Sequence, residues 1–449
     1  MNSFVGIGAN VAGGADSAAL SGDANAACDE YSAIGSGLSN DIGSGGGAYE
    51  SFIGAGQDNG IAAFDAFVGA GDGNTVSHEY SFVGAGYLNT VSGSGSFIGA
   101  GDDTALASSL KNGTIVLNAN TVSGTDSFIG TGDLNLVSGN GSFIGAGDTA
   151  YASTGPPVVP GNQIAGADSF IGAGDQNTVS ANEAFIGSGG SNTVNSAGSY
   201  AAIPGGYQNT AAGSYASILG GFGNTVNGSY ATVAGGRNNT AAGELSFAAG
   251  YHADAVNNGS FVWSDYVAGS ALLKDSAKNQ FVVRAAGGVY LYSSDPATSG
   301  EEIPAGESTW ASLSDRNAKT NIAPLDDAAI LDKVAALPID RWSYKSDTAV
   351  RHVGPMAQDF YAAFGTGVDD RHITAIDEDG VALAAIKALH RDNNRLRAAF
   401  EAAEKRKGDQ IAAERAQISM QHAAIATQEG EIAALRSAMR RLGAEIKAR

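Results

Sequence analysis

The chain has 449 residues, of which 64 are glycine, 43% are hydrophobic and only 16% are charged. This composition excludes a disordered polyelectrolyte, and the lack of a strict Gly-X-Y period excludes collagen. The net charge is −21, and residues 1–300 carry −18 of it, which argues against nucleic acid or an anionic membrane as a partner.

Several further classes of protein are excluded by simple features. No apolar stretch is long enough for a transmembrane helix, and residues 1–20 do not have the pattern of a signal peptide. The single cysteine, Cys28, rules out an intrachain disulfide framework. We expect neither a cofactor nor a metal site.

Residues 1–265 are built from a repeat of 15 residues with the pattern Ser-Phe-Ile/Val-Gly-Ala-Gly-Asp-x-Asn-Thr-Val. Phe52, Phe67, Phe82 and Phe97 mark the period. Fifteen residues suit one coil of a parallel β-solenoid, with two short strands and two Gly/Asn turns. We therefore predict a mainly β fold of roughly seventeen such coils. Two insertions, about 102–125 and 148–167, interrupt the register, and the second, with Pro156, Pro157 and Pro160, is predicted to be an exposed loop.

The two large apolar residues of each repeat are neighbours, so their side chains point to opposite faces of the strand. One fills the coil and the other leaves it. An outward apolar stripe has to be covered, and a coil this small is expected to bury little core by itself. Association of several chains answers both needs, and a homotrimer is the simplest closed form.

Two polar ladders accompany the repeat. The aspartates that follow the glycine pair, Asp72, Asp133, Asp148 and Asp175, are expected to be solvated turn residues, with a calcium ladder or paired catalytic carboxylates as the alternative. The repeated asparagines are expected to stack inside the turns. The alternative for the Asn-Thr-Val ladder is an ice- or glycan-binding face.

A small β neck is predicted over 266–313, with a hairpin over 280–293 around Gly287 and Gly288. From Ser314 the composition changes, and an α+β region is predicted. Its expected elements are a helix over 326–337, strands over 339–344 and 352–354, a helix over 356–364 and a long helix from about 381.

The last helix carries large apolar residues in an unbroken step of seven: Ile411, Ile418, Ile425, Ile432, Met439 and Ile446. Leu389 and Leu396 form a similar seam earlier. Sustained heptads predict a coiled coil, and isoleucine-rich seams are compatible with three strands. Gly408 and Gly430 are expected to cause local fraying or a bend.

Two resemblances follow from these motifs. Residues 213–221 and 228–236, with their Gly-Ser-Tyr-Ala starts, resemble the head repeats of trimeric autotransporter adhesins. That resemblance covers about 1–265 and implies a trimer of left-handed parallel β-rolls. The amphipathic strands of that family's C-terminal outer-membrane anchor are not part of this sequence.

Residues 313–322, 354–359 and 379–387 resemble the C-terminal intramolecular chaperone domain of phage endosialidase tailspikes, a self-cleaving Ser/Lys peptidase. By position, the resemblance implies that Ser314 is the nucleophile, that Lys319 is its general base, and that the chain is cut between Leu313 and Ser314. Asn317-Ala318 departs from that family, which commonly has a bulkier apolar residue before the lysine. His352 is a candidate auxiliary in proton transfer, with a structural histidine as the alternative.

A Ser/Lys pair can cleave a peptide bond only if the lysine is neutral and lies close to the serine. A lysine serves as a base only when it is neutral, and burial favours the neutral form. Five residues separate the two positions, so contact requires the chain to turn back or a second chain to supply one partner. If burial requires the assembled trimer, cleavage reports correct folding.

The sequence therefore predicts a trimeric fibre or tailspike-like protein that binds a cell-surface glycan or receptor, placed on a virion tail or a bacterial surface. The predicted regions are a head (1–265), a neck (266–313), a self-cleaving chaperone domain (314–380) and a coiled-coil tail (381–449). Because the chain opens inside a repeat, a baseplate or other anchoring protein is expected at its N-terminus. Alternatives are a bacterial adhesin attached through another polypeptide and a polysaccharide-degrading enzyme with carboxylates on the head.

Overall fold

The computed structural model describes residues 2–101, 119–147, 160–267, 269–297 and 299–447, and the chain divides into two compact units. The first comprises residues 1–289 with 304–308, and the second comprises 290–303 with 309–449. Most of the two predicted insertions falls outside the described residues, as does Asp148.

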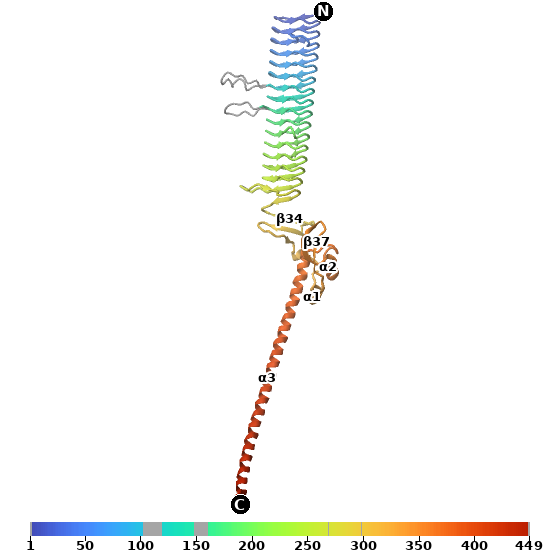
Figure 1. Cartoon of the computed structure of the whole chain (residues 1–449). Helices are drawn as coiled ribbons and strands as arrows, with labels where there is room; N and C mark the ends of the chain where they lie inside the picture. Colours follow the sequence, from blue (N-terminus) through green and yellow to red (C-terminus); the bar gives the residue numbers. More distant parts are fainter. Residues whose placement is uncertain (1, 102–118, 148–159, 268, 298, 448–449) are drawn as a thin grey trace. The chain divides into compact units, whose positions relative to one another are not determined.

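The first unit is a parallel β-solenoid, in which each coil adds one short strand to each of two sheets (Figure 1). Among the described residues the first sheet has seventeen strands and the second has sixteen. The strands of the first sheet are β1 (Phe4–Val5), β3 (Ala18–Ala19), β5 (Ala33–Ile34), β7 (Phe52–Ile53), β9 (Phe67–Val68), β11 (Phe82–Val83), β13 (Phe97–Ile98), β15 (Phe128–Gly132), β17 (Phe143–Gly147), β19 (Phe170–Ile171), β21 (Phe185–Ile186), β23 (Ala202–Ile203), β25 (Ser217–Ile218), β27 (Thr232–Arg237), β29 (Phe247–Tyr251), β31 (Phe261–Ser264) and β33 (Phe281–Arg284).

The second sheet runs along the other side of each coil in the same parallel register, for example Thr75 beside Thr90. Its strands are β2 (Val11–Ala12), β4 (Ala26–Ala27), β6 (Asp41–Ile42), β8 (Gly60–Ile61), β10 (Thr75–Val76), β12 (Thr90–Val91), β14 (Thr121–Val122), β16 (Leu136–Val137), β18 (Gln163–Ile164), β20 (Thr178–Val179), β22 (Thr193–Val194), β24 (Thr210–Ala211), β26 (Thr225–Val226), β28 (Thr240–Ala241), β30 (Ala253–Ala255) and β32 (Leu273–Lys274). The predicted solenoid is confirmed, and each coil repeats the register of the previous one.

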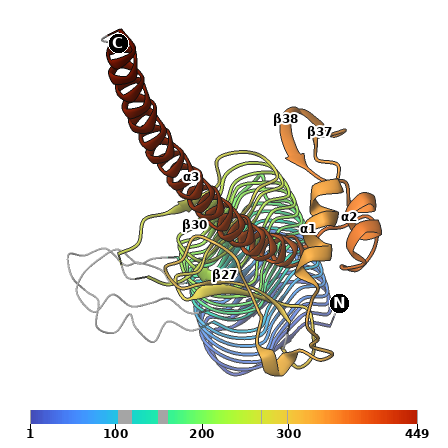
Figure 2. The same cartoon turned by 90° about the horizontal axis from the view of Figure 1, so that it is seen from below.

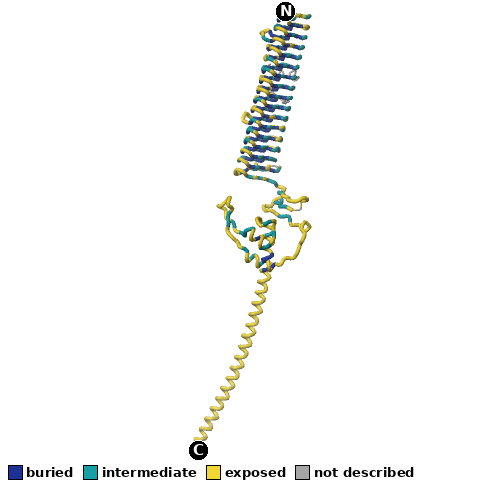
Figure 3. The backbone as a smooth tube through the Cα atoms, turned by 90° about the vertical axis from the view of Figure 1, so that its right-hand side faces the viewer, coloured by how far each residue is buried: buried dark blue, intermediate teal, exposed yellow. Residues whose placement is uncertain are grey.

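The inward and outward side chains of each repeat separate as predicted. Ile98, Ile129 and Ile144 are 0% exposed, whereas the phenylalanines that precede them lie on the outside of the coil. Successive phenylalanine rings stack at centroid distances of 4.7–5.0 Å between Phe67 and Phe170. The expectation that one coil buries little core is wrong, because a continuous row of fully buried isoleucine, valine and alanine fills the single chain (Figure 3). Stacking makes each coil's interior continuous with the next, so the core grows with coil number.

The predicted asparagine ladder is also confirmed. In most turns the buried asparagine donates from Nδ2 to Oδ1 of the asparagine one coil earlier, as Asn192 does to Asn177 at 3.0 Å. The same Nδ2 donates to a backbone carbonyl of the next coil, Gly206 O, at 2.9 Å. These bonds satisfy polar groups inside the turn that would otherwise be buried without a partner. The ladder is interrupted after the insertion at Asn120, and there Asn89 Oδ1 has no hydrogen-bond partner among the described residues.

Glycine is required in the turns for a steric reason. Gly71 has φ +114°, and a Cβ at this position would lie 2.1 Å from the carbonyl oxygen of Gly86 on the next coil. Only glycine allows the backbones of neighbouring coils to approach so closely.

The predicted hairpin over 280–293 is wrong. Phe281–Arg284 (β33) pairs in parallel with β31 and continues the first solenoid sheet. The run after Gly287 instead forms β34 (Gly288–Tyr292) in a small sheet with β35 (Gly300–Pro304) and β36 (Ala311–Ser312). The stacked coil already provides an edge with free backbone groups, so Phe281 extends its aromatic ladder at 4.8 Å from Phe261 instead of pairing locally.

The second unit continues with a 3-10 turn, η2 (Arg316–Ala318), and then with helices and a hairpin. These elements are α1 (Asp327–Ala336), the antiparallel strands β37 (Asp340–Tyr344) and β38 (Asp347–Gly354), α2 (Ala357–Phe364) and α3 (Ala375–Lys447). They match the predicted elements, although α3 begins six residues before the expected start at 381. The first turns of α3 pack against α1, as Figure 2 shows, and Ile330, Phe360 and Val381 lie in their shared core.

Helix α3 is continuous through Gly408 and Gly430, so the expected fraying at these glycines is not observed. Beyond Ala388 its residues are exposed in the single chain (Figure 3). The heptad residues share this exposure, which ranges from 42% at Ile411 to 71% at Ile446. Within the described residues no helix is long and apolar enough to cross a membrane.

Candidate functional site

The segment before Ser314 is held by a small sheet. Strand β36 pairs antiparallel with β35, with Ser312 opposite Glu301. Ser312 Oγ donates to Glu301 Oε1 at 2.5 Å, and the backbone N–H of Leu313 donates to the carbonyl oxygen of Gly300 at 3.2 Å. The peptide bond between Leu313 and Ser314 therefore follows directly after the last residue that the sheet fixes.

After Ser314 the chain turns back on itself. Asp315 caps η2 by accepting a hydrogen bond from the backbone N–H of Asn317 at 2.9 Å. The N–H of Lys319 then donates to the carbonyl oxygen of Arg316 at 3.2 Å. This compact turn reverses the chain over five residues, because an aspartate cap favours a tight turn at its start.

The turn brings two of the predicted site residues together. Lys319 Nζ donates to Ser314 Oγ at 2.5 Å within the same chain. Both side chains are exposed in the single chain. The geometry allows a proton to pass between hydroxyl and amine, while the dry surroundings that favour a neutral lysine are not provided by the described part of this one chain.

The third predicted residue lies elsewhere. His352 is on β38, opposite Trp342 of β37. Its ring stacks on Trp342 at a centroid distance of 4.6 Å and meets the edge of Tyr344 at 5.6 Å. Among the described residues no hydrogen bond joins His352 to Ser314 or Lys319, so its contacts are those of a packed aromatic cluster.

One charged residue with a structural role was missed by the sequence analysis. Asp327, at the start of α1, is 7% exposed and pairs with Lys387 Nζ at 2.9 Å and Arg391 Nη2 at 3.2 Å on α3. Asp327 is far in sequence from Lys387 and Arg391, and the signal that could have found this contact is the pair of cations one helical turn apart on α3.

No cluster of three or more potential metal ligands occurs among the described residues. The aspartate ladder gives none, although Asp133 and Asp175 each have an interaction partner. The head also has a groove on one corner of the solenoid near its N-terminal end.

Comparison with known proteins finds one similar family. Residues 314–369 match the family model described as chaperone of endosialidase (Peptidase_S74). The match begins at Ser314 and includes Lys319 and His352. No curated protein matches the chain. The chain thus joins a β-solenoid to a segment similar to the endosialidase chaperone domain, and this combination indicates a tailspike-like fibre.

Proposed function

We propose that the chain is the subunit of a trimeric, surface-binding fibre that processes itself. In this proposal the head (1–265) and neck (266–313) are the mature fibre. The chaperone domain (314–380) and the coiled-coil tail (381–449) drive assembly and then separate by cleavage between Leu313 and Ser314. The observation that carries the proposal is the contact between Lys319 Nζ and Ser314 Oγ at the first residue of the matched segment.

The cleavage follows from this contact. Neutral Lys319 takes the proton of the Ser314 hydroxyl, and Oγ attacks the carbonyl carbon of Leu313. The bond from that carbon to the Ser314 nitrogen breaks, and the nitrogen receives the proton from Lys319. Water then hydrolyses the ester. The products are a Leu313 carboxylate and a fragment that begins with the free amine of Ser314.

The trimer is supported by surface that one chain leaves uncovered. The heptad residues of α3 are large, apolar and exposed over the whole seam, which is the condition under which helices associate as coiled coils. Three copies bring three Ser314–Lys319 pairs to the same end of the coiled coil. Cover from neighbouring copies would then exclude water and make the lysine neutral, so that cleavage follows assembly.

A removable assembly domain would help the coils of the head to pair in the correct register. Parallel coils with near-identical repeats pair almost equally well in a slipped register, and such long-range pairing is slow. A coiled coil at the C-terminal end aligns three chains before the coils form. The finished head then stays assembled because its core is continuous, and the aligning segment is no longer needed. We place the fibre on a virion tail or a bacterial surface, held at its N-terminal end by an anchoring protein.

The test is the fate of the full chain in Ser314→Ala. The parent protein should give two fragments, and sequencing of the smaller one should start at Ser314. The variant should remain one band of 45.0 kDa. Ser346→Ala, a serine in the turn between β37 and β38, is the control and should cleave normally. Two fragments from Ser314→Ala would refute the nucleophile.

A further inference from the structure

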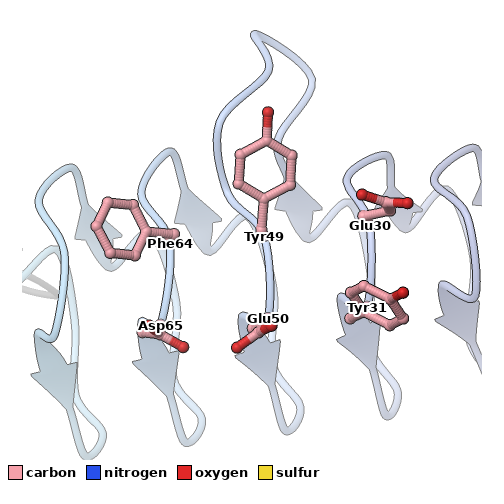
Figure 4. Close-up of a pocket in the computed structure, with 6 residues that line it drawn as sticks. All are labelled: Glu30, Tyr31, Tyr49, Glu50, Phe64 and Asp65. Carbon is pink, nitrogen blue, oxygen red and sulfur yellow. The ribbon is translucent and has the colours of Figure 1, made fainter.

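One corner of the solenoid is hollowed near its N-terminal end. The groove has a volume of about 410 Å³ and is lined by pairs of adjacent residues on three successive coils. The pairs are Glu30 with Tyr31, Tyr49 with Glu50, and Phe64 with Asp65 (Figure 4). Three aromatic rings and three carboxylates therefore face one space.

The groove is fixed by the backbone. The N–H of Glu50 donates to Glu30 O at 3.0 Å, and the N–H of Asp65 donates to Tyr49 O at 2.9 Å. Tyr31, Glu50 and Asp65 all have φ between 50° and 57°, the left-handed geometry that each corner requires. The six side chains thus project from three stacked coils with the same backbone geometry. Because this backbone is already fixed, ligand binding costs little conformational entropy there.

The aromatic rings of the groove are partly exposed, and Phe64 also makes an edge-to-face contact with Tyr80 of the next coil at a centroid distance of 5.3 Å. Tyr31, Tyr49 and Phe64 are 57%, 49% and 37% exposed. In Figure 4 the rings of Tyr49 and Phe64 stand on one side of the groove, while Tyr31 lies on the other side in the row of Glu50 and Asp65. Exposed ring faces beside polar groups are typical of sites for amphipathic ligands.

The same corner of the coil carries a different aromatic arrangement further along the head. Tyr200, Tyr215 and Tyr230 stack on each other with centroids 4.7 and 4.9 Å apart and planes within 5°. Because the faces of these three rings cover one another, the ladder exposes ring edges and hydroxyl groups to a ligand. The rings of Tyr31, Tyr49 and Phe64 in the groove are not stacked on one another in this way (Figure 4). Tyr215, at 48% exposure, is as exposed as Tyr49 and makes a matched control.

The charge of the groove selects the ligand. Residues 1–100 contain no lysine or arginine. Among the described residues, no ion pair involves Glu30, Glu50 or Asp65. The local potential is therefore negative, which repels carboxylated, sulfated and phosphorylated ligands and favours neutral or amino groups.

We propose that this groove binds a glycan of neutral or amino sugars. The apolar faces of the sugar rings lie on Tyr49 and Phe64. Sugar hydroxyl or amino groups donate hydrogen bonds to Glu30, Glu50 and Asp65, and such bonds to charged acceptors are strong. This inference rests on the surface-binding role proposed above and names the ligand class for it.

The experiment uses the full chain and three sets of immobilised oligosaccharides: neutral hexose, amino-sugar and sialylated. Binding should be confined to the first two sets. It should fall at least tenfold in Tyr49→Ala/Phe64→Ala and in Glu50→Gln, and remain unchanged in Tyr215→Ala. Trimer mass and self-cleavage are measured on the same preparations, so that a groove variant counts only when both match the parent.

The possible outcomes distinguish failure of the groove inference from failure of the fibre proposal. Binding of sialylated oligosaccharides alone contradicts the charge argument, and undiminished binding by Tyr49→Ala/Phe64→Ala contradicts the location. A parent that forms trimers and cleaves but binds no oligosaccharide refutes the groove while the fibre proposal stands. A parent that binds through the groove but is monomeric and uncut refutes the fibre proposal alone. Release of shortened oligosaccharides would mean that the groove is catalytic and not a binding site.

Discussion

The buried carboxylate of Asp327 contacts Lys387 Nζ at 2.9 Å and thereby joins α1 to the first turns of α3. Asp327 lies in the segment matched by the chaperone family, whereas Lys387 lies beyond it. Helix α1, within the matched segment, and the first turns of α3 thus share one packed core.

Replacing Asp327 by asparagine should loosen this core. The variant keeps the shape but loses hydrogen bonds to a charged group, each worth about 1.5–3 kcal/mol. Lys387 and Arg391 can return to water, so the loss should stay near the lower figure. Chemical unfolding in the uncut Ser314→Ala background measures it, with exposed Asp332→Asn on the same helix as control. Equal stability of the two variants would show that the ion pair contributes nothing.

Lys319→Arg should abolish self-cleavage. Arginine keeps the positive charge but cannot be deprotonated in proteins, so it cannot act as a base. The cleavage rate of the full chain, followed by gel electrophoresis, should drop by about 10²-fold or more. Lys333→Arg, an exposed lysine on α1, should cleave like the parent. Normal cleavage in Lys319→Arg would mean that the lysine only positions the hydroxyl.

Ile425→Asp should dissociate the trimer. A carboxylate in a seam of three helices is desolvated beside two others of the same charge. Light scattering should report a lower mass than that of the parent, and cleavage should fall with it. Ala426→Asp adds the same charge outside the seam and should leave both unchanged. Loss of mass without loss of cleavage would separate processing from assembly.

Asn192→Leu should destabilise the head. Asn192 Oδ1 accepts from the backbone N–H and Nδ2 of Asn209, both at 3.1 Å, and leucine removes this acceptor. The backbone N–H of Asn209 then loses its partner, whereas Nδ2 keeps the carbonyl oxygens of Gly205 and Gly221. Each unpaired group costs about 1–3 kcal/mol. The unfolding temperature of the head should fall, while Thr193→Ala on the outer face should have little effect. A variant as stable as the parent would mean that water replaces the ladder.

The last coils should respond to acid through two aspartates of opposite behaviour. Burial opposes ionisation of Asp275, but backbone N–H groups of Val256 and Asn257, at 2.7 and 3.0 Å, lower its pKa overall. Its contribution is therefore present above the ordinary pKa of about 3.9 and is lost as pH falls through the lower folded value. Burial, with Asp275 nearby, raises the pKa of Asp254 despite Lys274. Its favourable contribution is present at low pH and is lost as pH rises through the raised value.

Thermal unfolding at pH 7 and below pH 4 tests this pair. At pH 7, Asp275→Asn should destabilise the head by about 1–3 kcal/mol, because two bonds to a charge weaken. Asp254→Asn should stabilise it at the same pH. Both differences from the parent should shrink in acid. The same sign for both variants at pH 7 would contradict the assignment.

Features that depend on a local period can be predicted from the amino-acid pattern alone. The 15-residue spacing specified the coil, the alternation within Phe-Ile specified which side chain is inside, and the repeated asparagine specified the ladder. The step of seven from Ile411 predicts a seam on α3. In the solenoid the neighbours of a residue are copies of itself at a constant offset, so the pattern alone defines the contacts.

Contacts between unlike segments emerged only from the folded chain. It placed Phe281–Arg284 on the last coil and not in a hairpin, joined Asp327 to Lys387, and gathered Tyr49 and Phe64 into a groove. It also turned Lys319 back onto Ser314 within one chain. Such a contact forms when it lowers the free energy of the whole packed unit more than the alternative local pairing does. That difference depends on segments distant in sequence, so a periodic pattern does not contain it.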